Sequence, residues 1–305
     1  MLRNLQYIGR LLKLWYFLRK EKPDLIHSFD LESGIYIKII QKYLFTSRST
    51  KLIIGFGANT IEHAPTANIL SRNSFQPDAY TCNSAAGKKC LNDILPKLAP
   101  PIYVIYNGLS TLPALKDEPE WRKKNSLIVG CISKFDNNKR GERIFELAEA
   151  LGSTHPNIHF VFIGTGGGFN EWKSYYESQK KRFYNLTLLG VVQDAMQLVH
   201  YFDIGILFSE NEGFPNAVLE YMLCGKPVVT TIAGETTTLV KNNENGFLVD
   251  PYEVEKFSAK IQQLCTDEEA RRRMGEFARE YAKNSFSFTK MVEKHRFVYE
   301  SLLYK

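Results

Sequence analysis

The residues with the clearest potential for chemistry are two glutamates eight positions apart, Glu212 and Glu220, in the segment SENEGFPNAVLEYMLCGKPVVTT at 209–231. Glu212 falls in the loop that follows a strand-like run. Glu220 falls inside the next predicted helix, for which Asn216 is suited as the N-cap. Because helical side chains lean toward the N-terminus, the Glu220 carboxylate can reach the cleft at the helix start. An ionised carboxylate offers only acceptors, so this position suits a pair of ribose hydroxyl groups.

The start of the same predicted helix is suited to a phosphate, because free backbone N–H groups follow a glycine-containing loop. A helix dipole alone contributes only about 0.3–1 kcal/mol. A diphosphate needs charge-assisted hydrogen bonds as well, each contributing about 1.5–3 kcal/mol. The loop SKFDNNKRG at 133–141 can supply them. We therefore assign Lys134 and Lys139 to a diphosphate.

Strand-like and helix-like segments alternate along the whole chain, which predicts βα units and parallel sheets. The expected strands lie at 25–29, 51–57, 78–84, 102–108, 126–132, 157–164, 186–190, 203–209, 227–231 and 246–249. The expected helices lie at 4–20, 33–44, 139–151, 170–184, 194–201, 216–224, twice within 252–283, and at 286–305. In such sheets ligands bind beyond the carboxyl ends of the strands. The loops that should carry a site are 133–139, 164–169, 190–194 and 209–216.

We predict an α/β chain of two Rossmann-like domains, of which the second is a complete doubly wound parallel sheet. The charged, proline-containing stretch STLPALKDEPEWRKKN indicates a linker between them. The expected division is a partial amino-terminal domain at 1–112, a linker at 113–125, a second domain at 126–283, and a helix at 284–305 that packs back toward the amino-terminal domain.

Composition excludes several classes of protein. The chain has 305 residues, 44% hydrophobic and 24% charged, with a formal net charge of +6. No apolar run approaches the roughly 20 residues that span a bilayer. The five scattered cysteines form no C-x-x-C pair, which argues against a zinc site or a disulfide framework and favours a reduced, cytoplasmic setting. No nucleic-acid-binding module is recognisable, so no nucleic-acid partner is expected.

The segment EGFPNAVLEYMLCGKPVV resembles the E-x7-E signature of the family 4 retaining glycosyltransferases of GT-B fold, also called glycosyl transferases group 1. Other motifs of that family surround it in the same order: SKFDNNK, FIGTGG, LLGVVQD, DIGILFS and NGFLVD. The resemblance covers nearly all of 126–283. It extends more weakly into KPDLIHSFD, CNSAAG and VIYNG.

The resemblance implies a role for each matching residue. Glu220 would bind the ribose, and Glu212 would contact the transferred sugar and support charge developing at its anomeric carbon. Lys134 and Lys139 would stabilise the leaving diphosphate, so no metal or other cofactor is expected. Backbone groups would line the sugar and phosphate pocket at Gly213, Phe214, Pro215 (carbonyl only), Asn216, Ala217 and Val218. Val191 and Val192 would lie near the base, and Gly164 and Gly166 would allow close approach of the backbone to the nucleotide.

Three features of the first half of the chain each leave two interpretations open. His27, in KPDLIHSFD, either lies in the cleft for the acceptor or is a packed structural histidine. The stretch 58–73, with His63 and Arg72, either faces the acceptor or is a simple connection. The basic amphipathic start, with Arg10 and Lys13, either makes peripheral contact with a membrane or packs on the sheet.

The function that the resemblance implies is transfer of a sugar from a UDP- or GDP-linked donor to a glycan or lipid-linked acceptor in cell-surface polysaccharide synthesis. We expect it in the cytoplasm or at the inner face of the plasma membrane. The first strand and glycine-rich loop of the family are not recognisable before KPDLIHSFD. A fragment, a completing partner or lost activity would each explain this. Alternatives are therefore a non-catalytic partner subunit that binds a nucleotide sugar, or a nucleotide-sugar epimerase of similar fold.

Overall fold

The computed structural model of the chain describes residues 2–44, 50–57, 69–72, 75–96, 99–109, 117–122 and 125–304. The chain divides into two compact units: unit 1 is Met1–Tyr106 with Met291–Lys305, and unit 2 is Asn107–Lys290. The sequence placed these divisions at 112 and 284 instead. The difference has a local cause, because Leu109 forms a parallel bridge with Ser287. The two segments that connect the units, around Leu109 and around Ser287, therefore belong with unit 2.

The predicted linker lies partly outside the described residues, at 113–116 and 123–124. Within it, Arg122 donates to Asp203 Oδ2 at 2.9 Å and to the Ser126 carbonyl at 3.0 Å. This part of the linker is thereby attached to unit 2.

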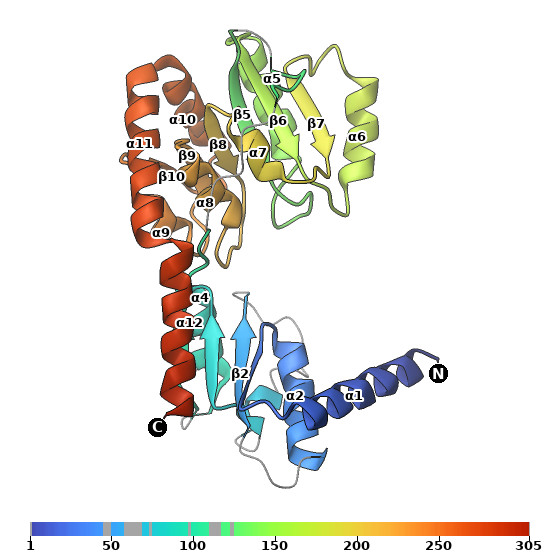
Figure 1. Cartoon of the computed structure of the whole chain (residues 1–305). Coiled ribbons are helices and arrows are strands. Elements are labelled where there is room, and N and C mark those ends of the chain that lie inside the picture. Colours follow the sequence, from blue (N-terminus) through green and yellow to red (C-terminus); the bar gives the residue numbers. More distant parts are fainter. Residues whose placement is uncertain are drawn as a thin grey trace. The chain divides into compact units, whose positions relative to one another are not determined.

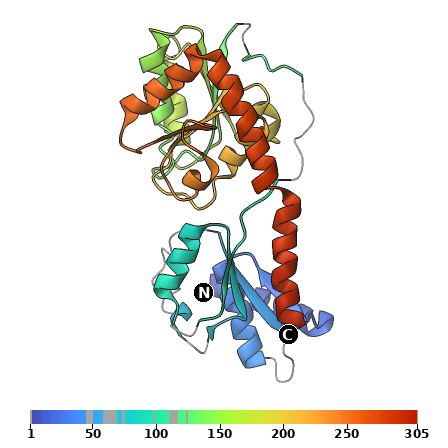
Figure 2. The ribbon, with the colours of Figure 1, turned by 90° about the vertical axis from the view of Figure 1, so that its left-hand side faces the viewer.

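Unit 1 is built on a parallel sheet in the order β1-β2-β3-β4 (Figures 1 and 2). Its strands are β1 (Leu25–Ser28), β2 (Lys51–Phe56), β3 (Ala79–Cys82) and β4 (Ile102–Val104). The apolar run of β2 is buried because both faces of a parallel sheet are covered. Leu52 and Ile54 pack with residues of α2 (Leu31–Leu44) and α4 (Ala85–Ile94) on one face. On the other face Ile53 packs with Val298 of α12 (Phe288–Leu303).

A long helix, α1 (Leu2–Glu21), precedes β1 and contacts α2. Leu18 of α1 is buried, and Leu14 packs against the core of unit 1. No helix among the described residues is long and apolar enough to cross a bilayer.

Unit 2 contains a six-stranded parallel sheet in the order β10-β9-β8-β5-β6-β7. The strands are β5 (Leu127–Ile132), β6 (Ile158–Ile163), β7 (Leu186–Gly190), β8 (Ile204–Leu207), β9 (Val228–Thr231) and β10 (Gly246–Val249). The chain runs outward from β5 to β7 and then returns to β8 on the other side of β5. The carboxyl ends of β5 and β8 therefore meet at a topological switch point, where ligands bind in sheets of this kind.

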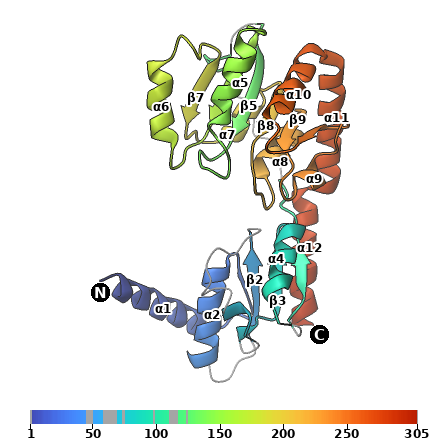
Figure 3. The ribbon, with the colours of Figure 1, turned by 180° about the vertical axis from the view of Figure 1, so that it is seen from behind.

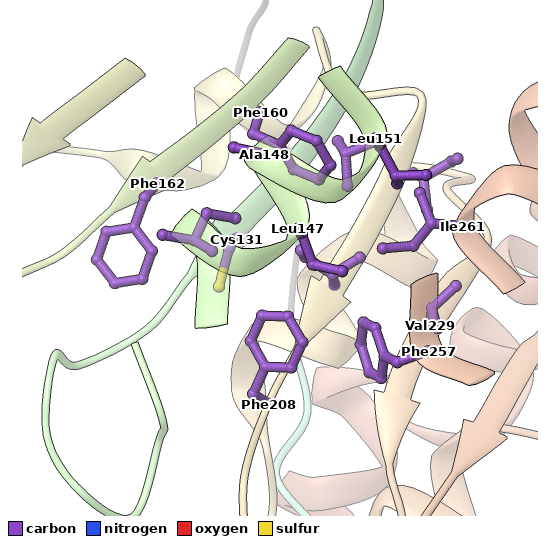
Figure 4. Packing of buried hydrophobic residues seen from close by; sticks show 14 of the residues in the cluster. Cys131, Leu147, Ala148, Leu151, Phe160, Phe162, Phe208, Val229, Phe257 and Ile261 are labelled. Atoms are coloured by element: carbon purple, nitrogen blue, oxygen red, sulfur yellow. The ribbon is translucent and has the colours of Figure 1, made fainter. Parts of the chain in front are cut away.

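Helices cover both faces of this sheet. They are α5 (Arg143–Gly152), α6 (Phe169–Ser178), α7 (Ala195–Val199), α8 (Asn216–Leu223), α9 (Thr236–Leu239), α10 (Val254–Thr266) and α11 (Glu268–Ser285). α5 and α10 lie on one face (Figure 3), and α7 and α8 lie on the other (Figure 1). Between the sheet and α5 and α10, side chains such as Phe160, Leu147 and Phe257 form the core shown in Figure 4.

Several predicted boundaries were wrong by a few residues. The helix expected at 139–151 begins at Arg143, because 137–142 form consecutive turns in which the Lys139 N–H donates to Asp136 Oδ1 at 2.8 Å. The helix expected at 170–184 ends at Ser178. The helix expected from Asn216 does begin there, but its N-cap is Pro215, which provides no side-chain cap, and not Asn216.

Candidate functional site

Two loops lie side by side at the switch point of unit 2. One follows β5 and contains 133–141, and the other follows β8 and contains 208–215. Their strands are paired, with Cys131 opposite Ile206. The Glu210 N–H donates to the Asn138 carbonyl at 2.9 Å, and Asn138 Nδ2 donates to the Asn211 carbonyl at 2.9 Å. Residues 72 and 73 positions apart in the chain are thus held together by direct hydrogen bonds.

Lys139 and Glu212, both predicted as catalytic, form an ion pair through Nζ and Oε1. The Glu212 side chain is only 6% exposed, and Ser209 Oγ lies 2.6 Å from the same carboxylate oxygen. A buried carboxylate is costly unless it is paired and hydrogen-bonded. Lys139 and Ser209 together meet that requirement. An ammonium has three N–H donors, so Lys139 retains donors for a second anionic partner.

A threonine in the neighbouring strand fixes Ser209. Thr231 Oγ1 accepts from the Ser209 N–H at 2.8 Å and donates to the Ser209 carbonyl at 2.6 Å. Both residues are buried. The end of β9 therefore determines where the Ser209 hydroxyl, and with it the Glu212 carboxylate, lies.

The loop after β9 packs against Glu212 from the other side. The Glu235 N–H donates to the Gly213 carbonyl at 3.1 Å. Gly234 has φ +49°, and a Cβ there would lie 1.8 Å from the Glu212 carbonyl oxygen. Only glycine fits so close to the site, which makes Gly234 a positioning residue that the sequence did not reveal.

At the start of α8 and just before it, most side chains have partners within the chain. Phe214 is buried against Phe286, with ring centroids 5.7 Å apart, and Val218 is fully buried. Asn216 Oδ1 accepts from Asn107 Nδ2 at 2.8 Å. Among the described residues, the N–H groups of Asn216 and Ala217 have no hydrogen-bond acceptor. Two amide donors at a helix start are thereby available to an anion.

Glu220 lies in the second turn of α8 and is half-buried. Burial raises the pKa of its carboxyl from 4.5 to about 7. No hydrogen bond or ion pair joins this carboxyl to any residue that the structure describes. The adjacent Tyr221 anchors the helix, because the Ile132 N–H donates to its Oη at 2.6 Å and Oη donates to the Ile206 carbonyl at 3.3 Å. The end of β5 thus fixes the position of Glu220.

Lys134 is exposed, and no hydrogen bond or ion pair joins it to Glu212 or Glu220 within the described part of the chain. Direct contact therefore joins two of the four predicted groups, Lys139 and Glu212. Lys134 shares the loop after β5, and Glu220 shares the helix that follows the Glu212 loop.

Gly164 and Gly166 lie beside the same β5 loop. Gly164 has φ +138°, and a Cβ there would lie 1.8 Å from the Ser133 carbonyl oxygen. A Cβ at Gly166 would lie 2.2 Å from the Phe135 carbonyl oxygen. The structure therefore gives both glycines a role within the chain, namely to let the loop after β6 approach 133–135. Their predicted approach to a nucleotide stays a prediction.

Val191 and Val192 follow β7, at the edge of the sheet. Val191 is 77% exposed and Val192 is half-buried. Three inter-strand steps separate β7 from β8, which is roughly 14 Å at about 4.8 Å per step. The predicted base-binding residues thus lie at a distance that an extended ligand must bridge.

His27 lies in unit 1 and has structural partners of its own. Its Nδ1 is 2.9 Å from Tyr299 Oη and its Nε2 is 2.9 Å from Thr81 Oγ1. Its ring stacks on Phe29 with centroids 4.3 Å apart. Burial, and then the nearby His295, lower the pKa of His27 to about 4, so its imidazole is neutral at pH 7. These contacts account for His27 as a packed structural histidine. Its predicted contact with the sugar acceptor stays a prediction. His63 lies outside the described residues.

Comparison with known proteins decides the family. The model of the family described as glycosyl transferases group 1 matches residues 115–281, more than half of the chain. The chain belongs to this family. The match includes both loops at the switch point and α8, so the site described above lies within the family domain of this glycosyltransferase.

Two curated relatives are similar to this glycosyltransferase over long segments. The UDP-Gal:alpha-D-GlcNAc-diphosphoundecaprenol alpha-1,3-galactosyltransferase of Escherichia coli is 25% identical over 95% of this chain and 78% of its own length. The N-acetyl-alpha-D-glucosaminyl L-malate synthase of Bacillus anthracis is 31% identical over 66% of this chain. The chain spans about half the length of this second relative and of the next three, between 47% and 54%.

Among solved structures, Anabaena Alr3699/HepE in complex with UDP and glucose has a TM-score of 0.77 and 21% identity, covering 96% of this chain and 80% of that one. This likeness confirms the predicted α/β fold with two parallel sheets, as in GT-B glycosyltransferases. Within the described residues of this glycosyltransferase, no group of three or more His, Cys, Asp or Glu side chains is arranged to hold a metal ion.

Proposed function

We propose that this chain transfers a sugar from a UDP-linked donor to a glycan or lipid-linked acceptor of a cell-surface polysaccharide, with retention of the anomeric configuration. The observation that carries the proposal is the pair of hydrogen-bonded loops that bring Lys139 against Glu212 at the switch point of unit 2. UDP is chosen over GDP because HepE is bound to UDP and the E. coli relative is named for UDP-Gal. That relative is also named for an acceptor on diphosphoundecaprenol.

In this proposal the diphosphate binds between the β5 loop and the start of α8. Lys134 and the remaining donors of Lys139 neutralise its oxygens, and the N–H groups of Asn216 and Ala217 add two hydrogen bonds. Charge-assisted hydrogen bonds of this kind contribute about 1.5–3 kcal/mol each. As the bond between the anomeric carbon and the diphosphate breaks, the leaving oxygen gains negative charge. Fixed donors then bind the transition state more tightly than the ground state, which is what accelerates the reaction. The proposal needs no metal for this step.

Glu212 acts on the sugar side of the breaking bond, where positive charge develops. Its ionised carboxylate, held by Ser209, lies where it can accept hydrogen bonds from the transferred sugar and stabilise positive charge at the anomeric carbon. Glu220 accepts hydrogen bonds from the ribose hydroxyls. Since the Glu220 pKa is about 7 in the ligand-free protein, hydroxyl donors that favour the ionised form should lower it when the nucleotide binds.

The proposal places the protein in the cytoplasm at the inner face of the plasma membrane. None of its five cysteines forms a disulfide, which suits a reducing compartment. An acceptor on a lipid carrier would also require access to a membrane surface.

The proposal is tested by incubating the purified chain with radiolabelled UDP-glucose, UDP-galactose and UDP-N-acetylglucosamine together with lipid-linked acceptors. We expect UDP release and a labelled glycan whose new linkage keeps the donor configuration by NMR. Epimerised donor with no transferred sugar would contradict transfer. Nucleotide binding with turnover only after a second polypeptide is added would identify a partner subunit instead.

A further inference from the structure

The outer face of α1 is unusual for a helix that packs on a sheet. Leu18 is 4% exposed and belongs to the buried side of α1. On the opposite side Leu12, Tyr16 and Phe17 are 55%, 65% and 56% exposed. Figures 1 and 3 both show α1 extending beyond α2, away from the sheet of unit 1. Large apolar side chains therefore face solvent on a helix whose inner side already has its partners.

The same helix is strongly basic. Residues 1–20 contain five cations (Arg3, Arg10, Lys13, Arg19 and Lys20) and no acid, whereas the whole chain has a net charge of +6. Arg10, Lys13, Arg19 and Lys20 are all exposed. Among the described residues of this helix, an ion pair joins Lys20 to Glu21 at 4.0 Å, a long and solvated contact. With Glu21 at its end, α1 carries five cations and one acid, a net charge of +4.

Two lysines interrupt the apolar residues of this face. At 100° per residue, Tyr16, Lys20 and Lys13 follow one another on the outer side, with Leu12 before them and Phe17 after them. A protein partner is favoured by a continuous apolar stripe, and this face has none. An anionic lipid surface accepts both kinds of side chain, since lysines bind phosphates while aromatic rings enter the headgroup region.

We propose that the outer face of α1 docks in the plane of an anionic lipid membrane. The cations supply electrostatic attraction of about 1 kcal/mol for each Lys or Arg near the surface. Leu12, Tyr16 and Phe17 insert at the depth of the headgroups. This contact is independent of the donor site in unit 2, so it can be tested without any sugar substrate.

The test is co-sedimentation with extruded vesicles of neutral phosphatidylcholine, and of phosphatidylcholine with about 30 mol% phosphatidylglycerol, whose negative surface potential attracts basic segments. The wild-type chain should bind the anionic vesicles and release them at high salt. The double variant Lys13→Glu/Lys20→Glu should bind at least about 30-fold more weakly, the equivalent of two lost contacts of ~1 kcal/mol each. Tyr16→Ser/Phe17→Ser should weaken binding at both salt concentrations.

The matched control is Lys173→Glu/Lys181→Glu, which makes the same change in net charge at two exposed lysines of unit 2. It should retain vesicle binding within about twofold, since long-range charge is screened within a Debye length. UDP titration of every variant checks that unit 2 is folded and separates this proposal from the proposed transferase function. Equal losses in the control and the α1 variant would overturn the proposal. So would absence of wild-type binding, or a dimer in sedimentation velocity that Tyr16→Ser/Phe17→Ser converts to monomer.

Discussion

The Glu220 side chain is half-buried, and its carboxyl has a pKa of about 7. This carboxyl has no hydrogen-bond partner among the described residues. Leaving such a group unpaired costs stability, and a ligand that donates to it would recover part of that cost. Glu212 is the contrasting case, because Lys139 and Ser209 already satisfy it. At the residue scale the site thus contains one carboxylate, Glu212, whose hydrogen bonds are satisfied without substrate. The other, Glu220, needs a ligand to satisfy it.

Replacing Glu220 with glutamine should therefore stabilise the ligand-free protein at high pH while weakening UDP binding. The native carboxyl keeps its proton up to about pH 7, and the unfolded one loses it near 4.5. Its stabilising contribution is present below pH 4.5 and is lost as the pH rises through 7. At pH 8 we expect Glu220→Gln to raise the free energy of unfolding by about 1–2 kcal/mol, and at pH 4.5 by almost nothing. Thermal unfolding at both pH values measures this.

The control for Glu220→Gln is Glu244→Gln, an exposed glutamate that should show no difference between the two pH values. The affinity for UDP should fall in Glu220→Gln and stay unchanged in Glu244→Gln. A Glu220→Gln protein that is less stable than wild type at pH 8 would contradict the account of this carboxyl.

Replacing Ser209 with alanine removes the hydroxyl that holds Glu212. We expect kcat for sugar transfer to fall roughly tenfold, since a positioned hydrogen bond to a charged group contributes about 1.5–3 kcal/mol. UDP affinity should change little, because Lys134 and the α8 amides are intact. Ser174→Ala, which removes an exposed hydroxyl bonded to the Asn170 carbonyl, is the matched control. Parallel losses of kcat and UDP affinity would instead indicate a general structural role.

At the element scale, the strands were the most predictable part of the fold. Runs such as LIIGF and IHFVFI are continuously apolar because their strands are buried on both faces. α4 and α9 were not predicted: α4 contains the polar stretch GKKC, and α9 has only four residues. The proximity of the loops after β5 and β8 follows from parallel topology. The contact between Ser209 and Thr231 joins residues 22 positions apart and leaves no local pattern in the sequence.

Substitutions in the loop after β6 test how closely this loop must approach the loop after β5. Gly164→Ala should destabilise unit 2 by about 2–4 kcal/mol, since the residue has a positive φ and its Cβ would meet the Ser133 carbonyl at 1.8 Å. Gly167→Ala, in the same loop, has no atom within 4 Å of its Cβ and should have little effect. Urea unfolding of both variants measures the difference. Equal stability of the two proteins would show that the loop relaxes around the methyl group.

At the scale of the whole molecule, the chain returns to unit 1 at its end. Val298 of α12 is 1% exposed and packs with Ile53, Ala79 and Ile105. Val298→Ala should cost about 2 kcal/mol and should reduce hydrogen-exchange protection in β2 and β3. Val292→Ala, on the exposed side of the same helix, should leave protection unchanged. Loss of protection confined to unit 2 would contradict this assignment.

The central claim is that the lysines of the β5 loop bind the diphosphate of the donor. Lys134 tests it most directly, because it is exposed and no hydrogen bond or ion pair joins its side chain to another described residue. Isothermal titration of Lys134→Ala should show about tenfold weaker binding of UDP and unchanged binding of uridine, with the exposed Lys173→Ala as control. Undiminished affinity of Lys134→Ala for UDP, or an equal loss for UDP and uridine, would contradict the claim.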